Sequence, residues 1–234
     1  MDGKQTPHRL GPQEIVGDCI DRSTPSVSPE VSSPLLIIPP PTRFVGLVLA
    51  GGRSLRMGLD KARLRVKGQT LIARQYSLLQ QAGATRVLVS LASDTPPPED
   101  WPLEVFVRDT IPNQGPLAGI DAAFQRDPSL PLLVLAVDLP AMSLNWLQQL
   151  VSRASAEQGV VPLTADGCEP LAAVYPPIAA AEITRRLASG SLSVRALAER
   201  GLNLGWMQAW RLSTEEMRCV LNWNHPSDWL ASES

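Results

Sequence analysis

From residue 43 onward, short apolar runs alternate along the chain with longer segments that have helical periodicity. The most apolar runs are FVGLVLA (44–50), RVLVSL (86–91) and PLLVLAVD (131–138). Runs that are apolar throughout are typical of parallel strands buried on both faces, and such strands are joined by crossover helices. The alternation therefore predicts one three-layer α/β domain with a mixed sheet over residues 43–234.

Helical periodicity and polar breaks predict where the other elements lie. Further strands are expected at 103–107, 159–163, 171–175 and 205–210. Helices are expected at 70–84, 117–126, 143–157, 178–187 and 191–199. Gly83 is expected to end the first of these helices, because glycine adopts the left-handed conformation common at helix C-termini.

Residues 1–42 differ in composition from the rest of the chain. They hold 8 of the 22 prolines, several serines and charges of both signs, without helical or alternating periodicity. Such composition predicts a disordered Pro/Ser-rich extension. Its first residues are polar and include Asp2, which is atypical of secretory signals and of organelle transit peptides.

The overall composition excludes several classes of protein. The net charge of -2 provides no basic field for binding nucleic acid. No apolar run approaches the roughly 18 residues that a membrane-spanning helix needs. The three cysteines, Cys19, Cys168 and Cys219, are far apart and form neither a disulfide framework nor a zinc motif. We therefore expect a cytoplasmic protein that binds neither nucleic acid nor a membrane.

The first apolar run ends at two adjacent glycines, Gly51 and Gly52, and several cations follow closely: Arg53, Arg56, Lys61 and Arg63. In open α/β sheets, ligands lie beyond the carboxyl ends of the strands. Glycines at this position leave backbone N–H groups accessible to an anion, and nearby cations suit a polyphosphate. A plain turn followed by a solvated basic surface is the alternative interpretation.

Two common nucleotide-binding motifs do not fit this loop. The dinucleotide fingerprint requires a second glycine where Arg53 stands, and the P-loop requires one where Met57 stands. A serine or cysteine hydrolase is also disfavoured, since the only histidines are His8 and His225 and no G-x-S-x-G motif occurs. The loop therefore predicts a different kind of phosphate-binding site.

Two carboxylates come directly after apolar runs. Asp109 follows VFVR, and Asp138 follows LLVLAV. An aspartate at the end of a buried strand has a fixed backbone and an accessible side chain, which suits a divalent cation. Asp138 is the better metal candidate, although each aspartate also fits a turn that ends a strand.

Four motifs together resemble those of the molybdenum cofactor guanylyltransferases. They are LAGGRSLRMGLDKARL (49–64), GPLAG (115–119), AVDLP (136–140) and NWNHPSD (222–228), in the same order as in that family. The similarity extends from about residue 44 to residue 229 and leaves the N-terminal extension outside. The resemblance implies a three-layer, Rossmann-like nucleotidyltransferase fold with a mostly parallel mixed sheet.

The resemblance also implies an activity and a site. GMP would be transferred from GTP to the terminal phosphate of molybdopterin, with Mg²⁺ required and pyrophosphate released. The residues implied in GTP binding are Leu49, Ala50, Gly51, Gly52, Lys61, Asp109 and Asp138. Asp138 would also bind Mg²⁺, and Asn224 would lie near the pterin. The chemistry of this reaction adds that Lys61, with Arg56 or Arg53, would act in catalysis by balancing charge on the departing pyrophosphate. Proteins of cofactor synthesis or molybdoenzyme maturation are the implied partners.

Two positions depart from the family pattern, and other functions stay open. Ser90 stands where an asparagine that binds the nucleotide is expected, and His225 replaces a common threonine. A CTP-dependent molybdopterin cytidylyltransferase or a sugar-1-phosphate nucleotidyltransferase would share the phosphate-binding motifs. A non-catalytic molybdenum cofactor-binding protein is the alternative from another class. Glu169 fits either the pterin site or a polar turn before a strand.

Overall fold

The computed structural model describes residues 42–51, 65–66, 68–92, 95–108 and 114–221. Contacts between Cα atoms divide the chain into two units, residues 1–39 and residues 40–234. The first unit lies outside the described residues, so the disorder expected for 1–42 stays a prediction. Everything below concerns the second unit.

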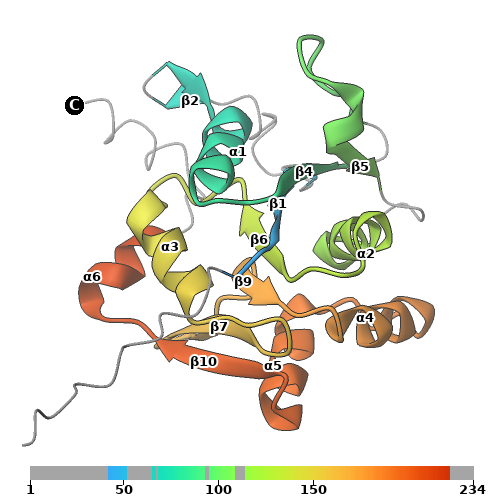
Figure 1. Cartoon of the computed structure of the whole chain (residues 1–234), viewed down its shortest axis with the longest axis vertical. Helices are drawn as coiled ribbons and strands as arrows, with labels where there is room; N and C mark the ends of the chain where they lie inside the picture. Colours follow the sequence, from blue (N-terminus) through green and yellow to red (C-terminus); the bar gives the residue numbers. More distant parts are fainter. Residues whose placement is uncertain (1–41, 52–64, 67, 93–94, 109–113, 222–234) are drawn as a thin grey trace, which may run out of the picture. The chain divides into compact units, whose positions relative to one another are not determined.

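A mixed sheet forms the middle layer of this unit (Figure 1). Its strands are β1 (Val45–Leu49), β4 (Arg86–Leu91), β5 (Phe106–Arg108), β6 (Leu132–Ala136), β7 (Gly159–Thr164), β8 (Gly167–Cys168), β9 (Ala172–Tyr175) and β10 (Met207–Arg211). Their order is β10-β7-β9-β6-β1-β4-β5, with β8 paired to β7. The pairs β6–β9, β7–β9 and β7–β8 are antiparallel, and the other pairs are parallel.

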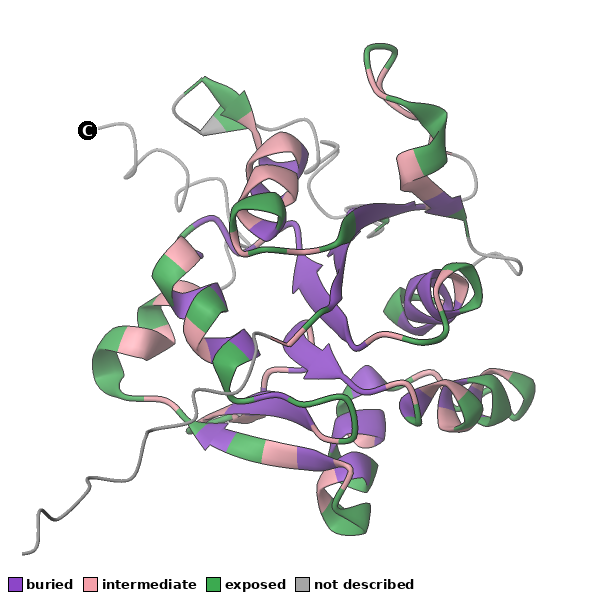
Figure 2. Ribbon diagram, viewed as in Figure 1, coloured by how far each residue is buried: buried purple, intermediate pink, exposed green. Residues whose placement is uncertain are grey.

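Helices pack against both faces of the sheet and form two apolar cores. One core includes side chains of α1 (Leu71–Gln81) and α3 (Leu144–Ser152). The other includes side chains of α2 (Pro116–Arg126), α4 (Ala179–Ala188) and α5 (Val194–Leu204). All five residues of β1 are buried, as are those of β6, which explains why these strands are apolar throughout (Figure 2). The predicted three-layer α/β fold is confirmed.

Three of the five helices α1 to α5 begin where a side chain accepts a hydrogen bond from the first helical turn. Thr70 caps α1, Ser143 caps α3 and Ser193 caps α5. Such caps satisfy N–H groups that have no partner inside the helix. At the other end of α1 the capping residue is Ala82, and Gly83 follows it with φ of 95°. The expected cap, Gly83, thus lies one residue beyond the observed cap, and the helix ends at Gln81 rather than at residue 84.

Some predicted boundaries were wrong. Residues 103–105 form a 3₁₀ turn, η2 (Leu103–Val105), so the strand predicted at 103–107 is only β5. The helix predicted at 143–157 ends at Ser152, because the Ser155 hydroxyl accepts hydrogen bonds from the N–H groups of Glu157 and Gln158 and forms a turn. The helix predicted at 191–199 is α5, which begins only after the Ser193 cap.

Short elements were not predicted. They are the hairpin of β2 (Arg65–Val66) and β3 (Gln69–Thr70), the strand β8, the helix α6 (Thr214–Met217) and the 3₁₀ turn η3 (Arg218–Val220). None is long enough to establish a periodicity in the sequence. Among the described residues, no helix is both long and apolar enough to cross a bilayer.

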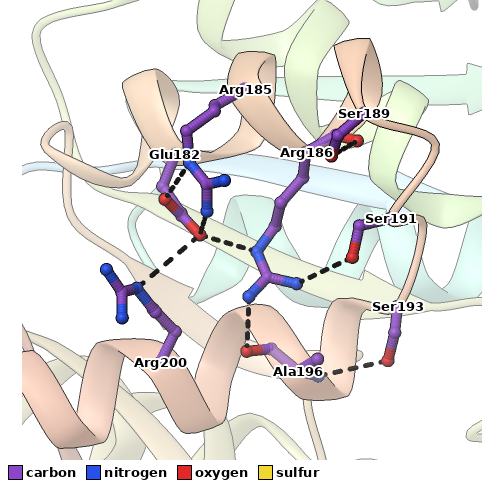
Figure 3. A network of polar contacts seen from close by, with 8 residues as sticks. All are labelled: Glu182, Arg185, Arg186, Ser189, Ser191, Ser193, Ala196 and Arg200. Atoms are coloured by element: carbon purple, nitrogen blue, oxygen red, sulfur yellow. Dashed lines mark hydrogen bonds and ion pairs between the residues drawn. The ribbon is translucent and has the colours of Figure 1, made fainter.

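A network of charged side chains joins α4 to α5 (Figure 3). The Oε1 atom of Glu182 lies 2.8 Å from Nε of Arg186 and 2.6 Å from Nη2 of Arg185. Arg186 also donates to the carbonyl oxygen of Ala196, at the start of α5, over 3.1 Å. Hydrogen bonds from Arg185 lower the pKa of the Glu182 carboxyl below its ordinary value, and those from Arg186 act in the same direction. The network therefore stabilises the contact between the two helices.

Candidate active site

The register of the central strands brings the ends of β1, β4 and β6 to one edge of the sheet. Leu49 is paired with Ser90 of β4 and with Ala136 of β6. Just beyond, the N–H of Ala50 donates to the carbonyl oxygen of Ser90 over 2.9 Å, and the N–H of Val137 donates to that of Leu49 over 3.1 Å. The chain segments leading to Gly51 and Asp138 therefore leave adjacent strands side by side.

Gly51 occupies a position where no side chain fits. A Cβ atom on this residue would lie 2.8 Å from the backbone nitrogen of Ala92 and 3.1 Å from the carbonyl carbon of Leu91. Both neighbours are backbone atoms, which cannot rotate away. Glycine is thus required for the loop after β1 to pass close to the end of β4, and Gly51 itself remains exposed.

The helix α2 begins at the same edge. Gly115 caps it with φ of 66°, and Pro116 is its first residue. A Cβ atom on Gly119 would lie 2.3 Å from Oγ of Ser90 and 3.1 Å from Cδ2 of Leu49. The two glycines of the GPLAG motif therefore have separate roles: one permits the turn, and the other lets the helix pack closely on the ends of β1 and β4.

Ser90 belongs to this packing contact. It is the last residue but one of β4, it is 4% exposed, and its side chain lies beneath α2. The strand itself has the predicted bounds, 86–91.

Asp138 follows β6 and is partly buried. The next residues are held by the side chains of α1: Nε2 of Gln75 donates to the carbonyl oxygen of Leu139 over 2.7 Å, and Nη2 of Arg74 donates to that of Met142 over 2.9 Å. The backbone on both sides of Asp138 is therefore fixed, by β1 before it and by α1 after it.

Glu169 is a further carboxylate in this region, and its position was left open by the sequence. It lies between β8 and β9, where its N–H donates to the carbonyl oxygen of Pro162 over 2.9 Å. Burial raises the pKa of its carboxyl above the ordinary value, while the N–H of Leu171 and the charge of Arg195 oppose this shift. The charge of Asp138 also raises that pKa, so the two carboxylates lie near enough to interact.

The structure places only part of the predicted site, and the roles of all its residues stay predictions. Leu49, Ala50, Gly51 and Asp138 are brought to one edge of the sheet. The other candidates lie outside the described residues, and their roles stay predictions: Gly52, Arg53, Arg56, Lys61, Asp109 and Asn224. Sequence reasoning missed Arg74 and Gln75, because a side chain that binds distant carbonyl groups leaves no local motif.

The described residues at this edge fit a magnesium ion that arrives with a nucleotide. Mg²⁺ prefers hard oxygen ligands, and in nucleotide sites it takes one or two carboxylates together with phosphates and water. Asp138 offers such an oxygen donor on a fixed backbone. Within the described part of the chain, no three His, Cys, Asp or Glu side chains are grouped so as to hold a metal. Among the described residues Asp138 thus offers one carboxylate, and an ion held there would take its other ligands from phosphates and water.

Comparison with known proteins gives concordant results. The model of the MobA-like NTP transferase domain matches residues 46–203. A protein of Opitutus terrae named "Probable molybdenum cofactor guanylyltransferase" is 39% identical over 194 residues, which cover 79% of this chain and 92% of the relative. A Chloroflexus aggregans protein of the same name is 32% identical, over 78% of this chain and 90% of the relative.

Solved structures of low sequence identity share the fold. The molybdopterin-guanine dinucleotide biosynthesis protein A of Archaeoglobus fulgidus has a TM-score of 0.58 and 21% identity, and the match covers 81% of this chain and 96% of that one. The 2-C-methyl-D-erythritol 4-phosphate cytidylyltransferase of Thermus thermophilus has a TM-score of 0.59 and 17% identity, over 80% and 96%. On the family match and the sequence relatives, the chain belongs to the MobA-like NTP transferase family.

Proposed function

We infer that this chain is a molybdenum cofactor guanylyltransferase, which transfers GMP from GTP to the terminal phosphate of molybdopterin. One observation carries the proposal: Gly51 and Asp138, from two of the family motifs, leave paired strands at the same edge of the sheet. The extended similarity to relatives named for this activity supports the same conclusion.

The reaction is a substitution at phosphorus. An oxygen of the acceptor phosphate forms a bond to the α-phosphorus of GTP, the bond from that phosphorus to the bridging oxygen breaks, and pyrophosphate leaves. No covalent bond to the protein is needed, so catalysis consists of alignment and charge neutralisation. The fixed backbone around Gly51 and Asp138 suits the alignment.

Each proposed residue has a role in that step. The main chain of the loop from Leu49 to Gly52 would bind phosphate oxygens, and Asp109 would contribute to nucleotide binding. Asp138 would hold Mg²⁺, which when bound neutralises charge on the phosphates. Lys61 and Arg56, with Arg53 as an alternative to Arg56, would balance the charge on the departing pyrophosphate. Asn224 would contact the pterin. We further propose a cytoplasmic location, and proteins of cofactor synthesis or maturation as partners.

The identity of the base and of the acceptor needs a direct test, because cytidylyltransferases have the same fold. The purified protein should be incubated with Mg²⁺, molybdopterin and either GTP or CTP, and assayed for dinucleotide and pyrophosphate. We expect GTP to be used at least about 10²-fold more efficiently than CTP, since sites that hydrogen-bond a base strongly reject analogues.

The other outcomes each indicate a different protein. Preference for CTP would identify a cytidylyltransferase. In a parallel assay with a sugar 1-phosphate in place of molybdopterin, turnover would identify a sugar nucleotidyltransferase. If molybdopterin binds but no pyrophosphate is released, the chain is a non-catalytic carrier, and the proposal is wrong.

A further inference from the structure

Two neighbouring side chains of α1 bind the main chain immediately after Asp138. We call residues 138–142 the Asp138 turn. Gln75 donates from Nε2 to the carbonyl oxygen of Leu139 over 2.7 Å. Arg74 donates from Nη2 to the carbonyl oxygen of Met142 over 2.9 Å and from Nε to that of Pro140 over 3.2 Å. Three carbonyl groups of one short turn are thus held by a single helix.

Packing alone does not explain the glutamine at position 75. Its side chain is fully buried, and among the described residues its Oε1 atom has no hydrogen-bond partner. A buried amide oxygen without a partner is unfavourable, and a leucine or methionine would fill a similar volume without that cost. What the amide adds is the donor that binds Leu139.

The bond from Gln75 is also unnecessary for closing the turn. The carbonyl oxygen of Leu139 already accepts a hydrogen bond from the N–H of Met142, over 3.1 Å. An apolar residue at position 75 would therefore leave this carbonyl bonded, and the turn could form without the amide. The second bond instead restricts where the turn lies relative to α1.

The helix α1 is a firm support for such a contact. Leu71, Ile72 and Leu79 bury its inner side in the core beneath β1 and β4. The N–H of Val137 is bonded to β1, so the sheet fixes the residue before Asp138 while α1 fixes the residue after it. Only the side chain of Asp138 and its own backbone lie between these two attachments.

We propose that Arg74 and Gln75 are positioning residues that hold the Asp138 turn in the place where the Asp138 carboxylate binds the divalent cation of the nucleotide. The proposal rests on the proposed function, because it takes Asp138 as the metal ligand. Within the described part of the chain, the hydrogen bonds of both side chains go only to main-chain carbonyls of the turn, so any effect on the cation would pass through Asp138. Loss of residues that orient metal ligands typically lowers metal affinity or activity 10- to 100-fold.

The test measures metal binding separately from turnover. Mn²⁺ replaces Mg²⁺, and its affinity for the protein with GTP is determined by electron paramagnetic resonance, without molybdopterin. The variants are Gln75→Met, Arg74→Met and Arg74→Lys, and thermal unfolding is recorded for each. Gln81→Met is the matched control, because Gln81 lies on the same helix, is exposed and bonds only to Ser77 among the described residues.

We expect Gln75→Met and Arg74→Met each to weaken Mn²⁺ binding about 10-fold while unfolding cooperatively near the parent temperature. Arg74→Lys should recover part of the loss, since an ammonium group keeps the charge and can reach one of the two carbonyls. The Gln81→Met control should bind Mn²⁺ as the parent does.

Parent-like Mn²⁺ affinity in both Gln75→Met and Arg74→Met would overturn the proposal, as would a loss in Gln81→Met of the same size. If Asp138→Asn binds Mn²⁺ normally, Asp138 is not the ligand and the positioning role is also wrong. Failure of the proposed function is distinct: the parent would then make no dinucleotide with molybdopterin, whereas the Mn²⁺ measurements need no acceptor.

Discussion

At the scale of single residues, the described site depends on close packing at Gly51 and on hydrogen bonds to the main chain on either side of Asp138. Glycine is required at position 51 because a Cβ atom there would lie 2.8 Å from the backbone nitrogen of Ala92. Asp138 is placed by a hydrogen bond from the N–H of Val137 to β1 on one side and by two side chains of α1 on the other. Rigid placement of this kind is what alignment of two phosphates requires.

Replacement of Asp138 by asparagine tests the most important carboxylate. The amide keeps the shape of the side chain but removes its charge, so the fold should persist while binding of the divalent cation is lost. We expect kcat to fall by about 10²- to 10³-fold, comparable to loss of one preorganised electrostatic contact. Initial rates over a Mg²⁺ titration measure the effect, with circular dichroism to establish folding. A variant with kcat within about twofold of the parent would contradict the assigned role.

At the scale of elements, the contact between α4 and α5 depends on a buried guanidinium group. Arg186 is 8% exposed, and it joins Glu182 on its own helix to Ala196 at the start of α5. Hydrogen bonds to charged groups contribute more than neutral ones, and a buried partner left alone is costly. The pairing of these helices should therefore be sensitive to position 186.

Arg186→Met is expected to lower the free energy of unfolding by about 2–3 kcal/mol, because it leaves the Ala196 carbonyl and the Glu182 carboxylate with fewer partners. Urea denaturation measures the change. Arg185→Met is the matched control: it removes a neighbouring arginine whose side chain is 62% exposed, and should cost less. Equal losses in the two variants would show that burial of Arg186 adds nothing.

The network around Glu182 should also make the free energy of unfolding depend on pH, in a direction that its pKa shift determines. The pKa of Glu182 is lowered in the folded chain by its bonds from Arg185 and Arg186. The stability it contributes is therefore present above the unfolded carboxyl pKa, near 4.3, and is lost as the pH falls through the lower folded value. The difference in unfolding free energy between the parent and Glu182→Gln should be constant near neutral pH and shrink in acid. A difference that grew as the pH fell would reverse this interpretation.

At the scale of the whole molecule, the parallel half of the sheet was predictable and the smaller features were not. The strand β4 has the predicted bounds, because uninterrupted apolar residues mark a strand buried on both faces. The strand β8 and the hairpin of β2 and β3 have two residues per strand, too few for a pattern. Sequence reasoning therefore succeeds where burial alone decides the structure.

The candidate site likewise contains residues that could be identified from the sequence and residues that could not. Gly51 and Asp138 could be identified because a glycine pair and an aspartate at strand ends form local motifs. Gln75 could not, since its role depends on the meeting of α1 with a turn that lies 64 residues further along the chain. Glu169 stayed open for a related reason: it precedes β9, which runs antiparallel to β6, so the start of this strand lies at the edge where β6 ends.

The division of the chain into two units leads to a prediction at this scale. The described core, its cap residues and the edge with Gly51 and Asp138 all lie within residues 42–221. We expect removal of residues 1–41 to leave kcat/KM within about twofold of the parent, because the described core and the edge with Gly51 and Asp138 belong to the second unit. Steady-state assays of the two chains side by side measure this. A large loss would assign the extension a part in catalysis or folding.

The close approach of α2 to the sheet has an evolutionary consequence. With only 2.3 Å between Oγ of Ser90 and the place where a Cβ on Gly119 would stand, the two sites share one small volume. Homologous chains that retain this helix position should show covariation at the two sites, a bulkier residue at one being matched by a smaller one at the other. The choice of residue at position 90 is therefore constrained by the packing of α2 on the end of β4.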